Sequence, residues 1–494
     1  MAAGARVTPA AKTLPAGGAT EASDIPHASL PVSALATGER RLDGETYLTS
    51  GYGIRLQIEA NARHQALSDL ADIWQPPRLK GIGVAPDHGM PFLTATQVFD
   101  IRPTPRKWLA PSKTPKLAQR LVERDWILVT CSGTVGDAIV SYGPHLNAII
   151  SHDLLRLQVR RKEQLGFLYA FIRSRYGKQM LRSSHYGSIV KHLEPEHLFD
   201  IPVPATPVGL QERLNNQIRQ VFGHRDKAHR VSAEAERLFA DALALDLPDT
   251  SNLRTFDVPA SEMFSGRRRL DANHYNPTAR VIEQALRSSG LRIGPLGDVV
   301  ERILLPNRFK RVYMGEGIPY LDSEDIFKIN PEITKFIPAS SKKDASRYFV
   351  KRDWLLVARS GQTYGLNGSV MLASSWHEDK IISEHIIRVI PSASSPPSGY
   401  LQVAMGHPQL GRPLVLRLPF GSSVPEIAPE DLATVPLVRL GSSLEAEIAA
   451  LVEQATEERA AADEEEAAAV RSFEEHVKRS LHAEPKAGEH ATSA

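Results

Sequence analysis

The chain has 494 residues, with 59 Lys and Arg against 57 Asp and Glu, a formal net charge of +2, and 42% hydrophobic residues. This length exceeds one ordinary domain, and the hydrophobic content is too high for a chain that is disordered throughout. The single cysteine, Cys131, excludes a disulfide framework and a zinc site with several cysteine ligands. No run approaches the roughly 20 apolar residues of a membrane helix, so we expect a cytoplasmic protein with no membrane partner.

Both ends of the chain are expected to be flexible tails. Residues 1–30 are rich in Ala, Gly, Pro, Ser and Thr, and they lack the apolar run of a signal peptide. Residues 483–494 are expected to form a second flexible tail. The structured part of the chain should therefore lie between these two segments.

That part is an internal repeat, a feature that decides the fold. Arg-Arg-Leu-Asp at 40–43 recurs 228 residues later at 268–271, and Arg-Asp-Trp-Ile-Leu-Val at 124–129 recurs as Arg-Asp-Trp-Leu-Leu-Val at 352–357. Further pairs follow in the same order with a slowly growing offset: Gly187-Ser188 with Gly421-Ser422, and Pro195-Glu196 with Pro429-Glu430. The chain is therefore two copies of one unit, at about 31–250 and 251–482.

Each copy contains a short buried strand that runs into a glycine-rich turn. The apolar runs 127–130 and 355–358 predict these strands, and a second apolar run after each turn predicts a β-hairpin. We expect the second turn, ending at Gly365, to be one residue longer than the first, ending at Gly136. Each copy then closes in an extended segment with proline, which cannot be helical before that proline.

A long helix is predicted after each copy. The first follows the 4-3 spacing of a coiled-coil seam, with two polar exceptions that we expect to help fix the register. Its expected seam is Leu210, Leu214, Gln217, Val221, His224, Ala228, Val231, Ala235, Leu238, Ala242 and Leu245. The second helix has Leu444, Ile448, Leu451 and Ala455, then slips and resumes at Val470, Phe473 and Val477. Two such helices favour antiparallel pairing, although a lone amphipathic helix packed on its own domain is the alternative.

The expected architecture is thus α+β, with two tandem α/β domains joined by two long helices and related by a pseudo-twofold axis. The expected boundaries are 31–206 for the first domain, 207–250 for the central helix, 251–438 for the second domain and 439–482 for the C-terminal helix.

Charge is unevenly distributed along the chain. Residues 441–482 hold 11 acidic and four basic residues, and the remainder has 55 basic against 46 acidic residues, a net charge of +9. A moderately basic body is what a phosphate-facing surface needs, although a solvated surface with one acidic helix is the alternative. We expect the acidic run Asp463 to Glu466 to face away from DNA, toward solvent or a basic partner surface.

The motifs of several enzyme classes are missing. There is no Gly-x-x-x-x-Gly-Lys-Ser/Thr loop, no Asn/Asp-Pro-Pro-Tyr stretch of a nucleic-acid methylase and no His-Glu-x-x-His helix. The histidines near 185–197 have no histidine counterparts in the second copy, which favours a structural or DNA-facing role over a metal site. Cys131 aligns with Arg359, so a nucleophilic role is not indicated.

The repeated motifs resemble a known family. The Arg-Leu-Asp-x-x-x-Tyr opening, the Asp-Trp-Ile/Leu-Leu-Val-x-x-Ser-Gly hairpin and the exit Gly-Ser-Ser-Val-Pro-Glu-Ile at 421–427 look like the specificity (S) subunit of type I restriction–modification enzymes. The resemblance covers about residues 33–482, including the duplication and both long helices. The first copy departs from it at its exit, which reads Gly-Ser-Ile-Val-Lys-His-Leu at 187–193.

The resemblance implies a non-catalytic DNA-recognition subunit of an anti-phage defence system. Two target-recognition domains would each read one half of a split double-stranded DNA sequence, and an antiparallel coiled coil would set the gap. The implied partners are two DNA methyltransferase subunits and, in some assemblies, ATP-dependent restriction subunits. No cofactor is expected in this chain, because S-adenosylmethionine and ATP with Mg would belong to those partners.

DNA-contacting residues are expected in polar loops that differ between the copies, as two different half-sites require. The candidates are Gln75, Arg78, Lys80, Thr96, Gln97, His185, Tyr186, Ser188, Asn307, Arg308, Lys310, Gln362, Thr363, Tyr364, Ser422 and Ser423. For each of these residues, an ordinary surface role is the alternative. For the whole chain, the alternatives are a scaffold of a related defence complex and a nuclease with an unrecognised centre.

Overall fold

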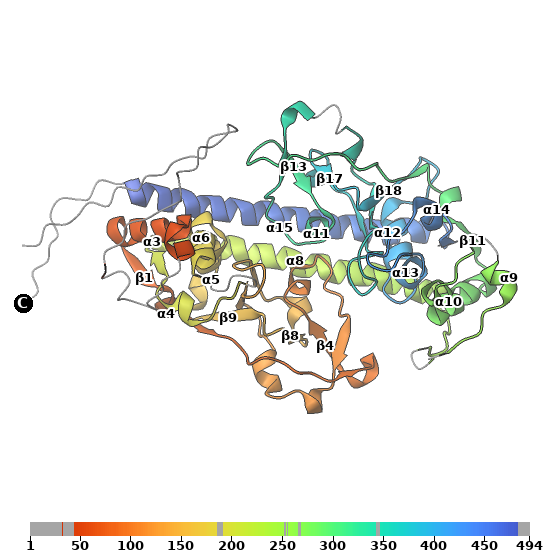
Figure 1. The fold of residues 1–494 in the computed structure, drawn as a ribbon, viewed down its shortest axis with the longest axis horizontal. Coiled ribbons are helices and arrows are strands. Elements are labelled where there is room, and N and C mark those ends of the chain that lie inside the picture. Colours follow the sequence, from red (N-terminus) through yellow and green to blue (C-terminus); the bar gives the residue numbers. More distant parts are fainter. Residues whose placement is uncertain are drawn as a thin grey trace, which may run out of the picture.

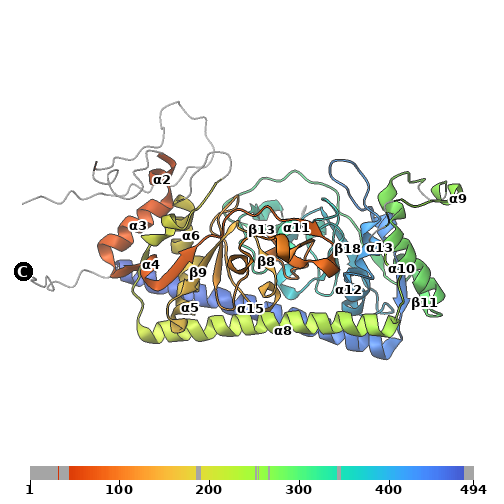
Figure 2. The ribbon, with the colours of Figure 1, turned by 90° about the horizontal axis from the view of Figure 1, so that it is seen from below.

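The computed structural model describes residues 44–184, 191–250, 255–264, 268–341 and 346–482, together with Val32 and Leu253. Two long helices, α8 (Val208–Leu243) and α15 (Ser442–His482), lie side by side along the molecule (Figure 1). The other elements form an N-terminal module before α8 and a C-terminal module between α8 and α15. Both modules lie on one side of the helix pair (Figure 2). The expected tails, 1–30 and 483–494, fall outside the described residues.

Helices and strands are mixed in both modules, in agreement with the expected α+β class. The N-terminal module contains α2 (Gly44–Leu48), α3 (Ser50–Asn61), β1 (His64–Ala66), α4 (Leu67–Leu70), β2 (Ala71–Trp74), β3 (Gly83–Val84), β4 (Met90–Leu93), β5 (Lys107–Leu109), β6 (Ile127–Thr130), β7 (Ala138–Val140), β8 (Ile149–Ile150), β9 (Leu154–Val159), α5 (Leu165–Arg173), α6 (Arg175–Ser183), α7 (Glu196–Phe199) and β10 (Pro202–Pro204). The C-terminal module contains α9 (Ala260–Met263), α10 (Pro277–Ser288), β11 (Arg292–Pro295), β12 (Arg302–Leu304), β13 (Ile318–Leu321), α11 (Ser323–Ile326), β14 (Phe336–Ile337), β15 (Leu355–Ala358), β16 (Val370–Leu372), β17 (Ile381–Ile382), β18 (Ile386–Ile390), α12 (Ser398–Gly406), α13 (Arg412–Leu416), α14 (Pro429–Leu432) and β19 (Pro436–Arg439).

The two modules share one sheet topology. The main sheet has the order β2-β9-β6-β7 in the N-terminal module and the equivalent order β12-β18-β15-β16 in the C-terminal module. A smaller sheet in each module has one parallel pair, β4 with β8 or β13 with β17. The central strands β6 and β15 are buried along their whole length, as the apolar runs at 127–130 and 355–358 require.

The hairpin turn after the central strand differs more between the modules than the sequence predicted. Val129 pairs with Ala138 in the first hairpin, and Val357 pairs with Val370 in the second, so the second turn is four residues longer. The expectation of one extra residue is wrong because it matched Gly136 with Gly365. The strand register makes Gly368 the equivalent of Gly136, and both glycines have positive φ, at 76° and 89°.

A buried arginine occupies the same place in each module. Arg156 of β9 and Arg388 of β18 are both 0% exposed and lie opposite Leu128 and Leu356 of the central strands. Arg156 donates to the Ile150 carbonyl at 3.0 Å and the Ser151 carbonyl at 2.9 Å. The Arg388 guanidinium donates to the equivalent carbonyls, those of Ile382 at 2.6 Å and Ser383 at 3.0 Å. Each arginine thus fixes the loop that leads into its own strand, because buried carbonyls need a donor.

The two long helices are antiparallel. Arg225 of α8 contacts Glu466 of α15, whereas Ser232, seven residues later in α8, accepts a hydrogen bond from Arg459, seven residues earlier in α15. Because the paired positions move in opposite directions, the helices run in opposite directions. Each module contacts both helices, the N-terminal module through α5 and the C-terminal module through α12.

The buried face of α8 differs from the predicted seam. Leu210, Leu214, Val221, Ala228 and Ala235 are buried as predicted, but the intervening buried residues are Ile218, Arg225, Ser232, Phe239 and Leu243. The prediction of Gln217, His224, Val231, Leu238 and Ala242 is therefore wrong by one residue, which is about 100° around a helix of 3.6 residues per turn. The physical reason is that α8 packs on α5 as well as on α15, so its buried face is not a simple two-helix seam.

The seam predicted for α15 agrees more closely with the burial seen in the structure. Ile448, Ala455, Phe473 and Val477 are buried, whereas Leu444, Leu451 and Val470 are half-buried. His224 of α8, although outside the buried face, remains near α15, since its Nδ1 lies 2.6 Å from the Glu458 carboxylate.

The orientation predicted for the acidic run at 463–466 is wrong for its first and last residues. Glu466 is 1% exposed, and its carboxylate lies 2.7 Å from Arg225 and 3.3 Å from Arg173. Asp463 lies 3.0 Å from the same Arg225 guanidinium. Residues three apart share one face of a helix, and here that face meets a buried arginine. Only the intervening Glu464 is exposed, so the run does not face solvent as a unit.

The two modules also contact each other directly, through equivalent segments. The amide of Ile101 donates to the Phe327 carbonyl at 2.8 Å, and the amide of Ile329 donates to the Phe99 carbonyl at 2.8 Å. Asp100 and Lys328 form an antiparallel bridge between these bonds. Residues 99–101 and 327–329 are 228 positions apart, so equivalent segments of the two copies pair with each other. This contact adds to the helix pair in fixing the modules relative to each other.

Candidate nucleic-acid interface

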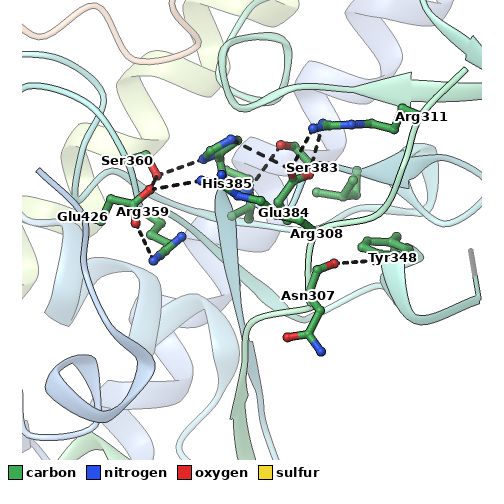
Figure 3. Close-up of polar contacts among 12 residues, drawn as sticks. Asn307, Arg308, Arg311, Tyr348, Arg359, Ser360, Ser383, Glu384, His385 and Glu426 are labelled. Carbon is green, nitrogen blue, oxygen red and sulfur yellow. Dashed lines mark hydrogen bonds and ion pairs between the residues drawn. The ribbon is translucent and has the colours of Figure 1, made fainter. Parts of the chain in front are cut away.

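Four loops of the C-terminal module meet at one end of its main sheet (Figure 3). They are residues 307–311 after β12, 359–364 after β15, 383–385 before β18 and 420–426 before α14. Ser360 Oγ lies 3.1 Å from Glu426 Oε1 and 3.0 Å from His385 Nδ1, and Arg359 forms an ion pair of 2.6 Å with the same Glu426. These contacts join loops far apart in sequence, so the cluster is a tertiary feature.

The cluster carries exposed cations at its edge. The Arg308 side chain is 72% exposed, and its guanidinium is 4.0 Å from Glu426 Oε1. Lys310 is exposed and forms no ion pair with a described residue. Arg311, in contrast, points inward and pairs with the buried Glu384 at 2.8 Å. In the loop 307–311, Arg311 therefore has a structural role, whereas Arg308 and Lys310 are exposed and can contact an anionic partner.

The backbone of the same loop, residues 307–311, is held in place by Tyr348. The Tyr348 hydroxyl donates to the Asn307 carbonyl, and its ring lies 4.3 Å, centroid to centroid, from that of Phe309. Asn307 itself is exposed, so its side chain points away from this support (Figure 3). A fixed backbone with outward side chains is the arrangement that sequence reading needs.

The hairpin tip and the exit loop form the second edge of the cluster. Gln362 Nε2 donates to the Ser423 carbonyl at 3.0 Å, and the amide of Gly361 donates to the Pro425 carbonyl at 3.1 Å. Tyr364, within the longer turn, is 72% exposed. Ser422 and Ser423 are also exposed, whereas Thr363 is half-buried.

Equivalent loops of the N-terminal module place Arg78 and Lys80 at matching positions. Trp74 pairs with Arg156, and Leu304 pairs with Arg388, so Arg78 and Lys80 follow β2 as Arg308 and Lys310 follow β12. Both side chains are exposed. The backbone of this loop is held by Arg120, which donates to the Pro77 carbonyl at 2.8 Å, where the C-terminal module uses a tyrosine.

Local charge in this loop is positive. Burial lowers the pKa of His152, and Asp153 opposes this, but Arg78, Arg120 and Arg156 lower it further. The surroundings of His152 thus favour its neutral form.

Two candidate residues of the N-terminal module donate hydrogen bonds to the backbone of their own module. Gln97 is 2% exposed, and its amide donates to the Thr104 carbonyl at 2.7 Å. Gln75 donates to the His152 carbonyl at 2.7 Å and points toward Cys131. Burial of Gln97 disfavours a DNA contact by this residue, whereas Gln75 is half-buried and stays a prediction. Thr96 is exposed but belongs to the segment that leads to the contact between modules at 99–101.

Three further candidates, His185, Tyr186 and Ser188, lie outside the described residues. Sequence reasoning missed a pair at equivalent positions, however. Ser132 bridges to His192 in the N-terminal module as Ser360 bridges to Glu426 in the C-terminal module. The Ser132 hydroxyl lies 3.1 Å from His192 Nδ1. The sequence already aligns His192 with Glu426, which could have indicated this pair. The equivalent positions carry an imidazole in one module and a carboxylate in the other.

Comparisons with known proteins concern the fold alone. No protein-family model and no curated protein matches the chain. The S subunit of a type I restriction–modification system from M. genitalium is similar over 86% of this chain and 97% of its own, with 12% identity and a TM-score of 0.33. A chain from a structural study of complex assembly and conformational transition in the type I system has 15% identity, a TM-score of 0.26, and coverage of 86% and 98%.

The HsdS subunit from Thermoanaerobacter tengcongensis has 16% identity and a TM-score of 0.24, with coverage of 86% of this chain and 97% of its own. Among the described residues, no helix is long and apolar enough to span a bilayer. The chain is therefore similar, over most of its length, to solved S subunits of type I restriction–modification systems.

Proposed function

We propose that this chain is a sequence-specific DNA-recognition subunit of the type I restriction–modification kind. Residues 31–206 and 251–438 would be its two target-recognition domains, each reading one half of a bipartite duplex target. The observation that carries this proposal is the matched pair of exposed cations, Arg78 with Lys80 and Arg308 with Lys310, after equivalent strands.

The surroundings of the two cation pairs differ in the way that two half-sites require. Phosphates are the same in every sequence, so the equivalent lysines suit them, whereas base edges differ and are read by the arginines together with the side chains that flank them. Asn307 and Tyr364 flank the second pair, and their counterparts in the first module are Pro77 and a shorter turn. Glu426 accepts hydrogen bonds where His192 stands in the first module.

The spacing between the half-sites would be set by two features. Helices 207–250 and 439–482 would act as an antiparallel coiled coil that keeps the modules at a defined separation. The contact between residues 99–101 and 327–329 supports a rigid arrangement, because it joins the modules themselves. Two modules at a fixed separation bind one duplex with an effective concentration that neither has alone.

The partners in this proposal are DNA methyltransferase subunits, two per chain, and in some assemblies ATP-dependent restriction subunits. The pseudo-twofold arrangement of the modules supports two equivalent docking places. S-adenosylmethionine and ATP with Mg would bind to those partners. The chain itself would orient them on DNA and would carry out no chemistry.

An internal module exchange tests this function. Residues 251–438 are replaced by a second copy of residues 31–206, and the chain is assembled with its co-purifying methyltransferase. Because the modules are related by a pseudo-twofold axis, the methylated target is expected to become two identical half-sites in inverted orientation. Mapping of methylated sites by long-read sequencing of the host DNA measures this result.

The unchanged chain and a chimera with the second module of a relative are the controls. The relative's module should change only one half of the target. Alteration of both halves in that chimera would contradict independent reading. Absence of sequence-selective, salt-dependent binding by the assembled complex would favour a scaffold, and metal-dependent cleavage by the isolated chain would favour a nuclease.

A further inference from the structure

A cavity of about 600 Å³ lies at the centre of the molecule, where both modules meet both long helices. Its walls come from residues 100–106 of the N-terminal module, residues 326–331 and 366–380 of the C-terminal module, and positions on α8, α12, α13 and α15. It also borders the contact between the modules, since Asp100 and Lys328 line it. Cavities of about 300–1,000 Å³ hold small organic ligands.

Three arginines in the lining lack adequate counter-ions. Arg412 makes one hydrogen bond, to the Gly365 carbonyl at 2.9 Å, and Arg459 makes one, to Ser232 Oγ at 2.7 Å. Within the described residues, neither guanidinium has a carboxylate oxygen within 4.0 Å. Arg106 has only Asp100, at 3.6 Å. Each guanidinium offers five N–H donors, so most donors of this set are unused.

The carboxylate nearest to these arginines is a weak counter-ion. Burial raises the pKa of Asp100 to about 7, against the opposing effect of Arg106, so this carboxyl is partly neutral at neutral pH. Burial lowers the pKa of Arg412, and the adjacent positive charge of Arg106 lowers it further. The other arginine–carboxylate pair of the lining, Arg102 with Glu236, is already matched. The Arg106–Arg412 side of the cavity therefore has an excess of positive charge.

The rest of the cavity wall is largely apolar. Phe327, Val370, Met371, Val403 and Val452 line it. These three arginines are half-buried, and a guanidinium that is partly removed from water favours a partner that supplies both charge compensation and acceptors. The matching ligand has a dianionic group at one end and an apolar body at the other.

We propose that this cavity binds a small phosphate monoester of about mononucleotide size. Its phosphate accepts hydrogen bonds from Arg106 and Arg412, and its body packs on the apolar wall. Arg459, on α15, adds positive potential from the helix side. A ligand there contacts both modules and both helices, so its binding stabilises one arrangement of the two modules. This inference does not depend on what the modules recognise.

Calorimetry and thermal unfolding of the full chain test this with AMP, inorganic phosphate and adenosine as probes. AMP is expected to bind and to raise the unfolding temperature, phosphate to bind more weakly, and adenosine to do neither. Arg412→Met should weaken AMP binding by about tenfold or more, since a charge-assisted contact is lost. Without ligand, the same variant should be as stable as the parent or more stable, because a half-buried charge without a carboxylate partner is removed.

Arg237→Met is the matched control and is expected to leave AMP binding unchanged, because Arg237 is exposed on α8 and is not among the residues that line the cavity. A short duplex should not compete with AMP for the site; competition would show that the cavity belongs to a DNA surface and would overturn the proposal. Failure of AMP and phosphate to bind at millimolar concentration would overturn it, as would AMP binding that persists in Arg412→Met.

Discussion

Glu466→Ala is expected to lower the free energy of unfolding by about 3–5 kcal/mol, the usual cost of removing one partner from a buried ion pair. The Glu466 carboxylate is contacted by Arg225 at 2.7 Å, by Arg173 at 3.3 Å and by the Asn330 amide at 2.5 Å, and it also accepts from the Tyr169 hydroxyl. These groups come from α8, from the N-terminal module and from the C-terminal module. Loss of the carboxylate therefore loosens three parts of the molecule and leaves Arg225 inadequately paired.

Urea unfolding at neutral pH, followed by circular dichroism, measures this loss. Glu475→Ala is the matched control, since Glu475 is exposed on the same helix and should change stability by less than about 0.5 kcal/mol. Equal stability of the two variants would mean that the Glu466 cluster contributes nothing net. Replacement of Arg225 and Glu466 together by apolar residues should be less destabilising than Glu466→Ala alone.

The same carboxylate predicts a dependence of stability on pH. Burial would raise the pKa of Glu466, but Arg225 and Arg173, with hydrogen bonds from Tyr169 and Asn330, lower it to about 2. A lowered pKa in the folded state adds stability that is present above the ordinary glutamate value of about 4.3. That stability is expected to disappear as the pH falls from about 4 to about 2, and Glu466→Gln should lose less over this range.

Arg308→Ala with Lys310→Ala is expected to give the largest effect on DNA binding, on the proposed function. An arginine that contacts a base pair typically contributes about 1–3 kcal/mol of discrimination, so the doubly substituted complex should bind its target about tenfold to a few hundredfold more weakly. The lysine contributes a phosphate contact, so its loss should reduce the slope of log K against log salt concentration by about one. Fluorescence anisotropy across a salt series measures both quantities.

Because each module would read its own half-site, substitutions in one module serve as a control for substitutions in the other. Arg308 and Lys310 should affect discrimination in one half-site only, and Arg78→Ala with Lys80→Ala should affect the other half. Arg352→Ala serves as the charge control, because Arg352 is exposed in the same module but precedes β15 rather than following it. If Arg352→Ala weakens binding as much as the double variant, the loop cluster is not the DNA-reading surface.

Sequence patterns alone identified the repeat and the central buried strands. A run such as Ile127–Thr130 must be buried wherever the chain folds, because all four residues are apolar or β-branched, and its recurrence at Leu355–Ala358 marks the second copy. The long helices were likewise evident, since apolar periodicity over many turns is a local property of the chain.

The sequence also carried a signal that was not used. Arg156 and Arg388 each interrupt an apolar strand at equivalent places, and a charged residue in a buried strand indicates a specific structural demand. That demand is the pair of loop carbonyls that each arginine satisfies, and these carbonyls become visible only when the sheet is assembled.

Tertiary structure decided which face of α8 is buried and what each polar side chain contacts. The 4-3 spacing assigned Gln217 and His224 to the seam, although both are polar. In the structure the next residue, Arg225, is buried instead of His224, since Glu466, 241 residues away, supplies its counter-charge. In the sequence, Gln97 likewise resembles a surface residue, but in the structure it is buried and donates a hydrogen bond to the Thr104 carbonyl. The contact between 99–101 and 327–329, and the central cavity beside it, join segments that no local pattern relates. Local periodicity fixes which segments are strands and helices, whereas compensation of buried charge and hydrogen bonding depends on distant residues and is settled only by packing.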